Sequence, residues 1–145
     1  MDIIEFKEDI PTFYVEAEGF PSGVKEAHDK LHSLLSGDED RPYYGISHNT
    51  EDRGIVYCAA AREMFPGEAQ SLGCKGFLVA KGSYLAETLH HWRKEEGIIA
   101  LTFQKLLHHP SIDPNGYCLE IYHPTGYVQC MVKLDDELLK IKSRI

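Results

Sequence analysis

The sequence lacks the features that mark several common classes of protein. No apolar run approaches the roughly 20 residues of a membrane-spanning helix. The stretch from Met1 to Glu8 is acidic, without the basic and apolar regions of a signal peptide. The four cysteines lie far apart and form no CxxC pair, so they predict neither a zinc site nor a disulfide scaffold. We therefore expect a cytoplasmic protein that has no membrane partner, bound metal or cofactor.

Positive charge is also scarce. The 145 residues include 15 Lys and Arg against 23 Asp and Glu, and the net charge is −8. Nucleic-acid binding usually needs a basic face, so we expect no nucleic-acid partner. An acidic chain weakly favours small cations over anions as ligands.

The order of apolar and polar residues divides the chain into two similar halves, 11–63 and 76–134, of one domain that spans 1–145. Strand patterns cover 12–18, 43–48 and 55–63 in the first half, and 77–81, 117–123 and 127–134 in the second. Helical patterns cover 23–36, 84–94 and 98–108. The sequence therefore predicts an α+β fold of pseudo-two-fold tandem strand–helix–strand–strand modules. We expect a curved antiparallel sheet with helices on one face and a ligand cleft on the other.

Alignment of the halves assigns side chains to the two faces of this sheet. Gly45-Ile-Ser-His48 aligns with Glu120-Ile-Tyr-His123, and Gly54-Ile-Val-Tyr-Cys58 aligns with Gly126-Tyr-Val-Gln-Cys130. The residues expected to pack under the helices are Ile46, Val56, Cys58, Ile121, Val128 and Cys130. The residues expected on the cleft face are Tyr43, Gly45, Ser47, Tyr57, Cys118, Glu120, Tyr122, Gln129 and Met131.

Glu120 is the residue around which we expect the cleft to be centred. It stands in the middle of a strand pattern, where Glu is a poor β former, and Tyr117 and Tyr122 are close to it. A carboxylate among aromatic rings suits an organic cation, through opposite charge and cation–π attraction. Gly45 is aligned with Glu120 and would leave room for a guest. The alternative is an exposed Glu on a solvated strand, as most Glu residues are.

A few other residues are candidates for the site. Tyr43, Tyr57 and Tyr122 would form the walls of the cleft, Met131 would be an adaptable surface, and Trp92 fits either the cleft or the core. His28 and His32 are four residues apart, a spacing that can hold a metal ion, but the sequence offers no third ligand.

The chain resembles the GyrI-like small-molecule-binding family, which includes the effector-binding domains of multidrug-responsive bacterial transcription regulators. The resemblance rests on Tyr44-Gly45, Gly54-Ile-Val-Tyr57, Lys81-Gly-Ser-Tyr84, Trp92 and Glu120-Ile-Tyr-His-Pro124. It implies tandem modules with a cleft at the pseudo-axis, in which the position matching Glu120 meets cationic aromatic ligands. Some stand-alone family members hydrolyse strained cyclopropane-containing compounds. No helix-turn-helix domain accompanies this chain, so we expect a stand-alone member rather than a transcription regulator.

Three functional interpretations follow. The first is drug or toxin sensing or sequestration, by binding amphipathic, cationic aromatic molecules at Glu120, Tyr122, Tyr57, Tyr43, Trp92 and Met131. The second is a small hydrolase of strained electrophilic compounds, with Glu120 as general base and a tyrosine as its partner. The third is an interaction module, such as a homodimer, that docks through an aromatic sheet face.

Overall fold

The computed structural model describes residues 1–36, 40–52 and 54–143. These residues form eight strands, four α-helices and one 3-10 helix. In chain order they are β1 (Asp2–Phe6), β2 (Ile10–Glu16), α1 (Val24–Leu34), β3 (Tyr43–Thr50), β4 (Gly54–Arg62), α2 (Glu68–Ser71), β5 (Lys75–Val79), β6 (Gly82–Leu89), η1 (Trp92–Lys94), α3 (Ile98–Leu106), β7 (Cys118–Tyr122), β8 (Val128–Lys133) and α4 (Asp136–Ser143). None of the helices in these ranges has the length and apolar content needed to cross a bilayer.

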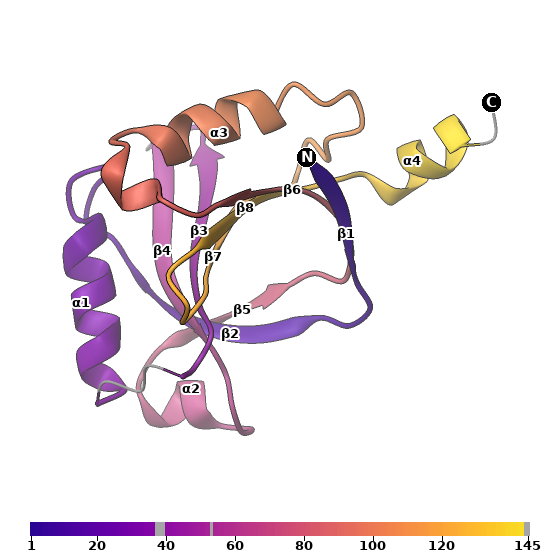
Figure 1. Ribbon diagram of the computed structural model, residues 1–145. Coiled ribbons are helices and arrows are strands. Elements are labelled where there is room, and N and C mark those ends of the chain that lie inside the picture. The colour runs from indigo at the N-terminus through magenta and orange to yellow at the C-terminus, as the bar shows by residue number, and fades with distance from the viewer. Residues whose placement is uncertain (37–39, 53, 144–145) are drawn as a thin grey trace.

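All eight strands belong to one antiparallel sheet in the order β1-β6-β8-β7-β3-β4-β2-β5. The sheet curls into a half-barrel, with α1 and α3 on its outer side (Figure 1). The units β2-α1-β3-β4 and β6-α3-β7-β8 occupy equivalent places on either side of the central β3–β7 pair. The expected α+β class, curved antiparallel sheet and helix-bearing face are therefore confirmed.

The two outermost strands are exchanged between the halves. Strand β1 precedes β2 in the chain but pairs with β6, whereas β5 precedes β6 but pairs with β2. Each half therefore contributes an edge strand to the other half. Neither half can complete its share of the sheet alone.

The helix expected over 84–94 is wrong. Residues Gly82–Leu89 form strand β6, and only Trp92–Lys94 are helical, as a short 3-10 turn. Leu85, Ala86 and Glu87 are good helix formers, but β6 bonds to β1 on one side and to β8 on the other. Hydrogen bonds along both edges of a strand outweigh a local preference of a few tenths of a kcal/mol per residue.

The apolar residues form clusters on both sides of the sheet. Inside the curl lies a cluster that includes Tyr44, Ile46, Val56, Cys58, Tyr84, Leu119, Ile121 and Met131. On the outer side, α1 packs on Phe13, Tyr43, Ala59 and Ala61, and α3 packs on Leu85, Cys130 and Val132. The expectation that Ile46, Val56, Cys58 and Ile121 lie under the helices is wrong, because these four residues fill the inner side.

The face assignment of β8 is right for Cys130, which packs under α3, but wrong for Gln129 and Met131, which lie on the inner face and not on the cleft face. Glu120 of β7 pairs with Cys130, and Ile121 pairs with Gln129. Cys130 and Val128 therefore share the outer face with Glu120, whereas Gln129 and Met131 share the inner face with Ile121. The sequence alignment placed Cys130 with Cys58, but Cys130 takes the place of Ala59, which pairs with Gly45. A slip of one residue exchanges the two faces of a strand.

Candidate functional site

A cleft of about 1100 Å³ opens on the outer side of the sheet, between α1 and the start of α3. It lies on the same face as the helices, so the expectation of a cleft on the opposite face is wrong. The first half contributes to its lining Pro21, Val24, Lys25, His28, Asp29, His32, Arg41 and Tyr43, and the second half contributes residues 92, 93, 95–99 and 122–124. The cleft therefore lies where the two halves meet.

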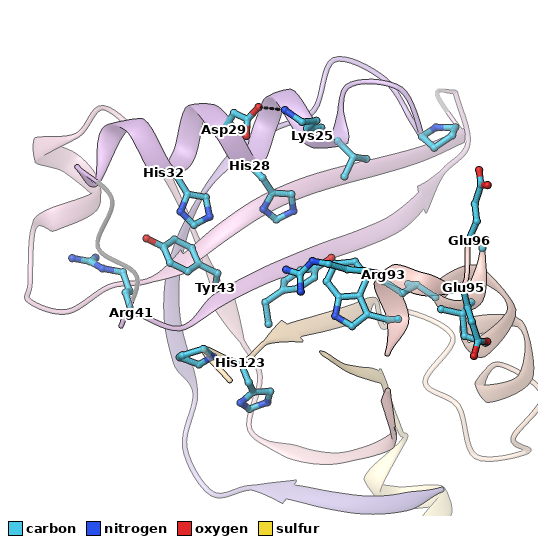
Figure 2. Close-up of a pocket in the computed structure, with 18 residues that line it drawn as sticks. Lys25, His28, Asp29, His32, Arg41, Tyr43, Arg93, Glu95, Glu96 and His123 are labelled. Atoms are coloured by element: carbon cyan, nitrogen blue, oxygen red, sulfur yellow. Dashed lines mark hydrogen bonds and ion pairs between the residues drawn. The ribbon is translucent and has the colours of Figure 1, made fainter. Parts of the chain in front are cut away.

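Helix α1 forms one wall with side chains spaced four residues apart. Val24, His28 and His32 lie one above another, because residues at this spacing share a helix face. Figure 2 shows His28 and His32 pointing from α1 towards the sheet, where Tyr43 stands below them. The buried Ala27 and Leu31 anchor the adjacent stripe of α1 in the outer core. The two histidines are thereby held over the sheet by apolar packing.

Glu120 lies in the sheet beneath this cleft. Its side chain is only 7% exposed, and its Oε1 accepts hydrogen bonds from the Tyr57 hydroxyl at 3.2 Å and from the Tyr122 hydroxyl. Tyr122 itself lines the cleft, so one hydrogen bond joins the buried carboxyl to the cleft wall. Among the described residues no basic side chain forms an ion pair with Glu120. This carboxyl is therefore buried without a charge partner, which is a costly arrangement.

Burial dominates the protonation equilibria of this group. It raises the pKa of the Glu120 carboxyl above its ordinary value, while the hydrogen bonds from Tyr122 and Tyr57 act in the opposite direction. Burial, followed by the nearby Glu120 charge, raises the pKa of both Tyr57 and Tyr122. Both phenols consequently remain protonated donors at neutral pH.

His28 extends the hydrogen-bonded chain to the cleft surface. Its Nε2 lies 2.8 Å from the Tyr57 hydroxyl, and its ring meets Tyr57 and Tyr122 edge-on at 5.7 and 5.6 Å between centroids. Burial, with a smaller contribution from the His32 charge, lowers the pKa of His28 to about 4. The imidazole is therefore neutral at physiological pH and does not repel a cation in the cleft.

Aromatic rings form the floor and the second wall. Trp92 is half-buried, with its ring centroid 5.7 Å from that of Tyr122, and its Nε1 donates to the carbonyl of Gly126 at 3.1 Å. The Arg93 guanidinium lies 4.4 Å from the centre of the Trp92 ring. The rings of His32 and Tyr43 lie 4.1 Å apart. These contacts present π faces and apolar edges to the cleft.

Charged side chains of both signs also line the cleft. Glu95 and Glu96 precede α3 and lie on the opposite side of the cleft from Arg41 in Figure 2. Arg41 forms a buried ion pair with Glu68 at 2.7 Å, and Lys25 pairs with Asp29 on exposed α1 at 2.7 Å. Two of the three basic side chains of the cleft thus have acidic partners of their own.

The sequence-predicted site residues fall into three groups. Tyr43, Tyr122 and Trp92 line the cleft. Glu120 and Tyr57 lie directly below it, joined by hydrogen bonds to Tyr122 and His28. Met131 is buried on the inner face of the sheet, away from the cleft.

The sequence did not predict that His28 and His32 contribute to the cleft. Their four-residue spacing indicated only a spacing compatible with metal binding. Within the described ranges no group of three or more His, Cys, Asp or Glu side chains is placed to hold a metal ion. A stripe of histidines beside an apolar helix stripe was the signal that could have indicated a cleft wall.

Comparisons with known proteins inform the fold alone. No protein-family model and no curated protein matches this sequence. Among solved structures, the chain is similar to an integron cassette protein, VCH_CASS2, from the mobile metagenome of Vibrio cholerae. The TM-score is 0.64, the identity is 13%, and the match covers 92% of this chain and 94% of the other. The curled α+β half-barrel is therefore shared with a bacterial protein along nearly the whole chain.

Proposed function

We propose that this protein binds organic cations that carry aromatic rings, in the cleft between α1 and α3. The observation that carries the proposal is the buried Glu120 carboxyl, which accepts hydrogen bonds from the Tyr57 and Tyr122 hydroxyls directly beneath a cleft with aromatic walls. A bound cation would supply the opposite charge that this carboxyl lacks among the described residues. The cleft volume of about 1100 Å³ can hold a drug-sized molecule.

The tyrosine between Glu120 and the cleft strengthens this interpretation. Tyr122 donates its hydroxyl hydrogen to Glu120, while its ring lines the cleft beside Trp92. A phenol that donates to a carboxylate gains electron density, which favours a cation over its ring. Because water is largely excluded around Glu120, its charge acts on a cation in the cleft more strongly than an exposed carboxylate would.

The arrangement supports binding more than hydrolysis. A general base must come within hydrogen-bond distance of the water it activates. Glu120 is 7% exposed and is not among the residues lining the cleft, and both tyrosine hydroxyls donate to it. The aromatic sheet face on which a homodimer would dock lies beneath α1 and α3.

Calorimetric titration with N-methylquinolinium and the uncharged 1-methylnaphthalene tests the proposal. We expect the wild type to prefer the cation, and Glu120→Gln to lose that preference while keeping the weaker affinity for the hydrocarbon. The loss should exceed the ~0–1 kcal/mol of an exposed ion pair, since the carboxyl is buried. The variant Glu8→Gln, which removes an exposed carboxylate that does not line the cleft, is the control and should retain the preference. Equal affinity of the wild type for both compounds would refute the proposal.

A further inference from the structure

The carboxyl beneath the cleft has an unusual set of neighbours. Titratable side chains reach Glu120 from three strands of the sheet: Tyr57 from β4, Cys118 and Tyr122 from β7, and Cys130 from β8. Burial raises the pKa of the Cys118 thiol to about 11 and that of the Cys130 thiol to about 12. These groups are therefore neutral at physiological pH.

The remaining neighbours add no positive charge. Gly45 stands opposite Glu120 on β3 and has no side chain. Above the tyrosines, helix α1 contributes His28, which is neutral near pH 7. Among the residues that the structure describes, the basic groups of the cleft, Lys25, Arg41 and Arg93, form no hydrogen bond or ion pair with Glu120. An ionised Glu120 would thus be a buried charge without a counter-charge, a state that proteins avoid by keeping the group neutral.

We propose that the empty cleft holds Glu120 as a carboxylic acid and that an organic cation binds in exchange for its proton. This inference rests on the proposed function. The O–H bond of Glu120 breaks, its bonding electron pair stays on the carboxylate, and the proton passes to a buffer base. The new carboxylate keeps its hydrogen bonds from Tyr57 and Tyr122 and gains the cation as its charge partner. No other reactant is needed.

The proton exchange describes the class of ligand more closely than a requirement for positive charge does. A permanent cation must release the proton to the solvent. A weakly basic aromatic amine can enter uncharged and become protonated in the cleft as Glu120 loses its proton, so that no net proton is released and the ammonium lies above the carboxylate. The uncharged form loses less hydration when it enters the site. Lipophilic, weakly basic amines are therefore ligands of this cleft alongside permanent cations.

The number of protons released on binding tests the exchange. Each ligand is titrated by calorimetry in phosphate and in Tris at about pH 6, above the ordinary pKa range of Glu. The dependence of the heat on the ionisation enthalpy of the buffer gives the number of protons. We expect about one proton released per N-methylquinolinium in the wild type, and close to none per quinoline, which is the weakly basic analogue. Glu120→Gln should release none with either ligand.

Two further measurements separate the possible outcomes. The control variant Glu8→Gln should release as many protons as the wild type, because it removes an exposed carboxylate that does not line the cleft and leaves Glu120 in place. Infrared difference spectra of the wild type should show loss of a protonated carboxyl band when N-methylquinolinium binds, which needs no variant to fold. Tight, Glu120-dependent binding without proton release or band loss would overturn the exchange and leave the proposed function intact. Absence of preferential cation binding would overturn both.

Discussion

Gly45 of β3 lies directly opposite Glu120 of β7, in the strand pair that joins the two halves of the sheet. A Cβ atom at position 45 would overlap the Tyr57 hydroxyl and would come within 2.8 Å of Glu120 Oε1. The space that a side chain would fill is therefore occupied by the Tyr57–Glu120 hydrogen bond. The expected room for a guest at Gly45 is taken by the protein itself.

The first prediction concerns this close approach. Gly45→Ala should destabilise the protein by about 1–3 kcal/mol, because the methyl group must displace Tyr57 or Glu120. It should also weaken binding of N-methylquinolinium. Gly76→Ala is the matched control, since Gly76 also lies in a strand and its added Cβ would meet only Thr12 O at 3.4 Å. Denaturant unfolding measures the stability of the two variants, and calorimetric titration measures their affinity for N-methylquinolinium. Equal stability of the two variants would contradict the close packing.

The second prediction tests which face of β7 is core. Ile121→Ala should lower the free energy of unfolding by about 2–5 kcal/mol, because Ile121 packs in the apolar cluster inside the curl. Ile55→Ala, on the neighbouring hairpin, removes the same atoms from a residue that is 42% exposed and should cost far less. If thermal melting of the two variants coincides, the register of β7 assigned by the structure is incorrect.

The third prediction concerns the stability of the empty protein. Since burial raises the pKa of folded Glu120 above its unfolded value, its contribution to stability is full below the unfolded pKa and falls as the pH rises through the folded pKa. Glu120→Gln should therefore be as stable as the wild type, or more so, near neutral pH. That advantage should shrink as the pH falls towards about 4.3. Unfolding free energies of both proteins across this pH range test the prediction. If Glu120→Gln is less stable than the wild type near neutral pH, burial does not raise the pKa of Glu120.

The fourth prediction concerns His28, whose shift has the opposite sign. Its folded pKa of about 4 lies below the unfolded value of about 6.5, so the unfolded state binds more protons between these limits. The free energy of unfolding should fall, by up to about 1.4 kcal/mol per pH unit, as the pH drops through this window. His28→Gln should reduce this slope, because the Gln side chain does not take up a proton in this pH range. An unchanged slope in His28→Gln would contradict the assigned burial.

The fifth prediction compares two ion pairs of the cleft. Arg41→Ala should destabilise the protein by about 3–5 kcal/mol, because it leaves the buried Glu68 carboxylate without the guanidinium at 2.7 Å. Lys25→Ala breaks an equally short pair with Asp29 that is exposed to solvent, and it should leave the melting temperature nearly unchanged. Similar melting temperatures for the two variants would contradict the expectation that the buried ion pair contributes more to stability than the exposed one.

The sequence alone determined much of the local structure. Alternation of apolar and polar residues identified β2, β3, β4, β7 and β8, and periodicity identified α1 and α3. The same alternation placed Tyr43, Tyr57, Glu120 and Tyr122 on one face, which the strand pairings confirm. The prediction was correct because side chains along a strand alternate between the two faces of the sheet. Residues paired across adjacent strands point to the same face.

Tertiary structure decided the rest. Residues 84–89 favour a helix locally, but the hydrogen bonds of β1 and β8 hold them as strand β6. Which face of the sheet would carry the helices could not be read from the sequence, because both faces bury apolar residues. His28 and Tyr57 are 29 residues apart in the sequence, and the packing of α1 on the sheet brings them into contact. Such contacts depend on where whole elements meet, and the periodicity of a single element contains no information about its partner.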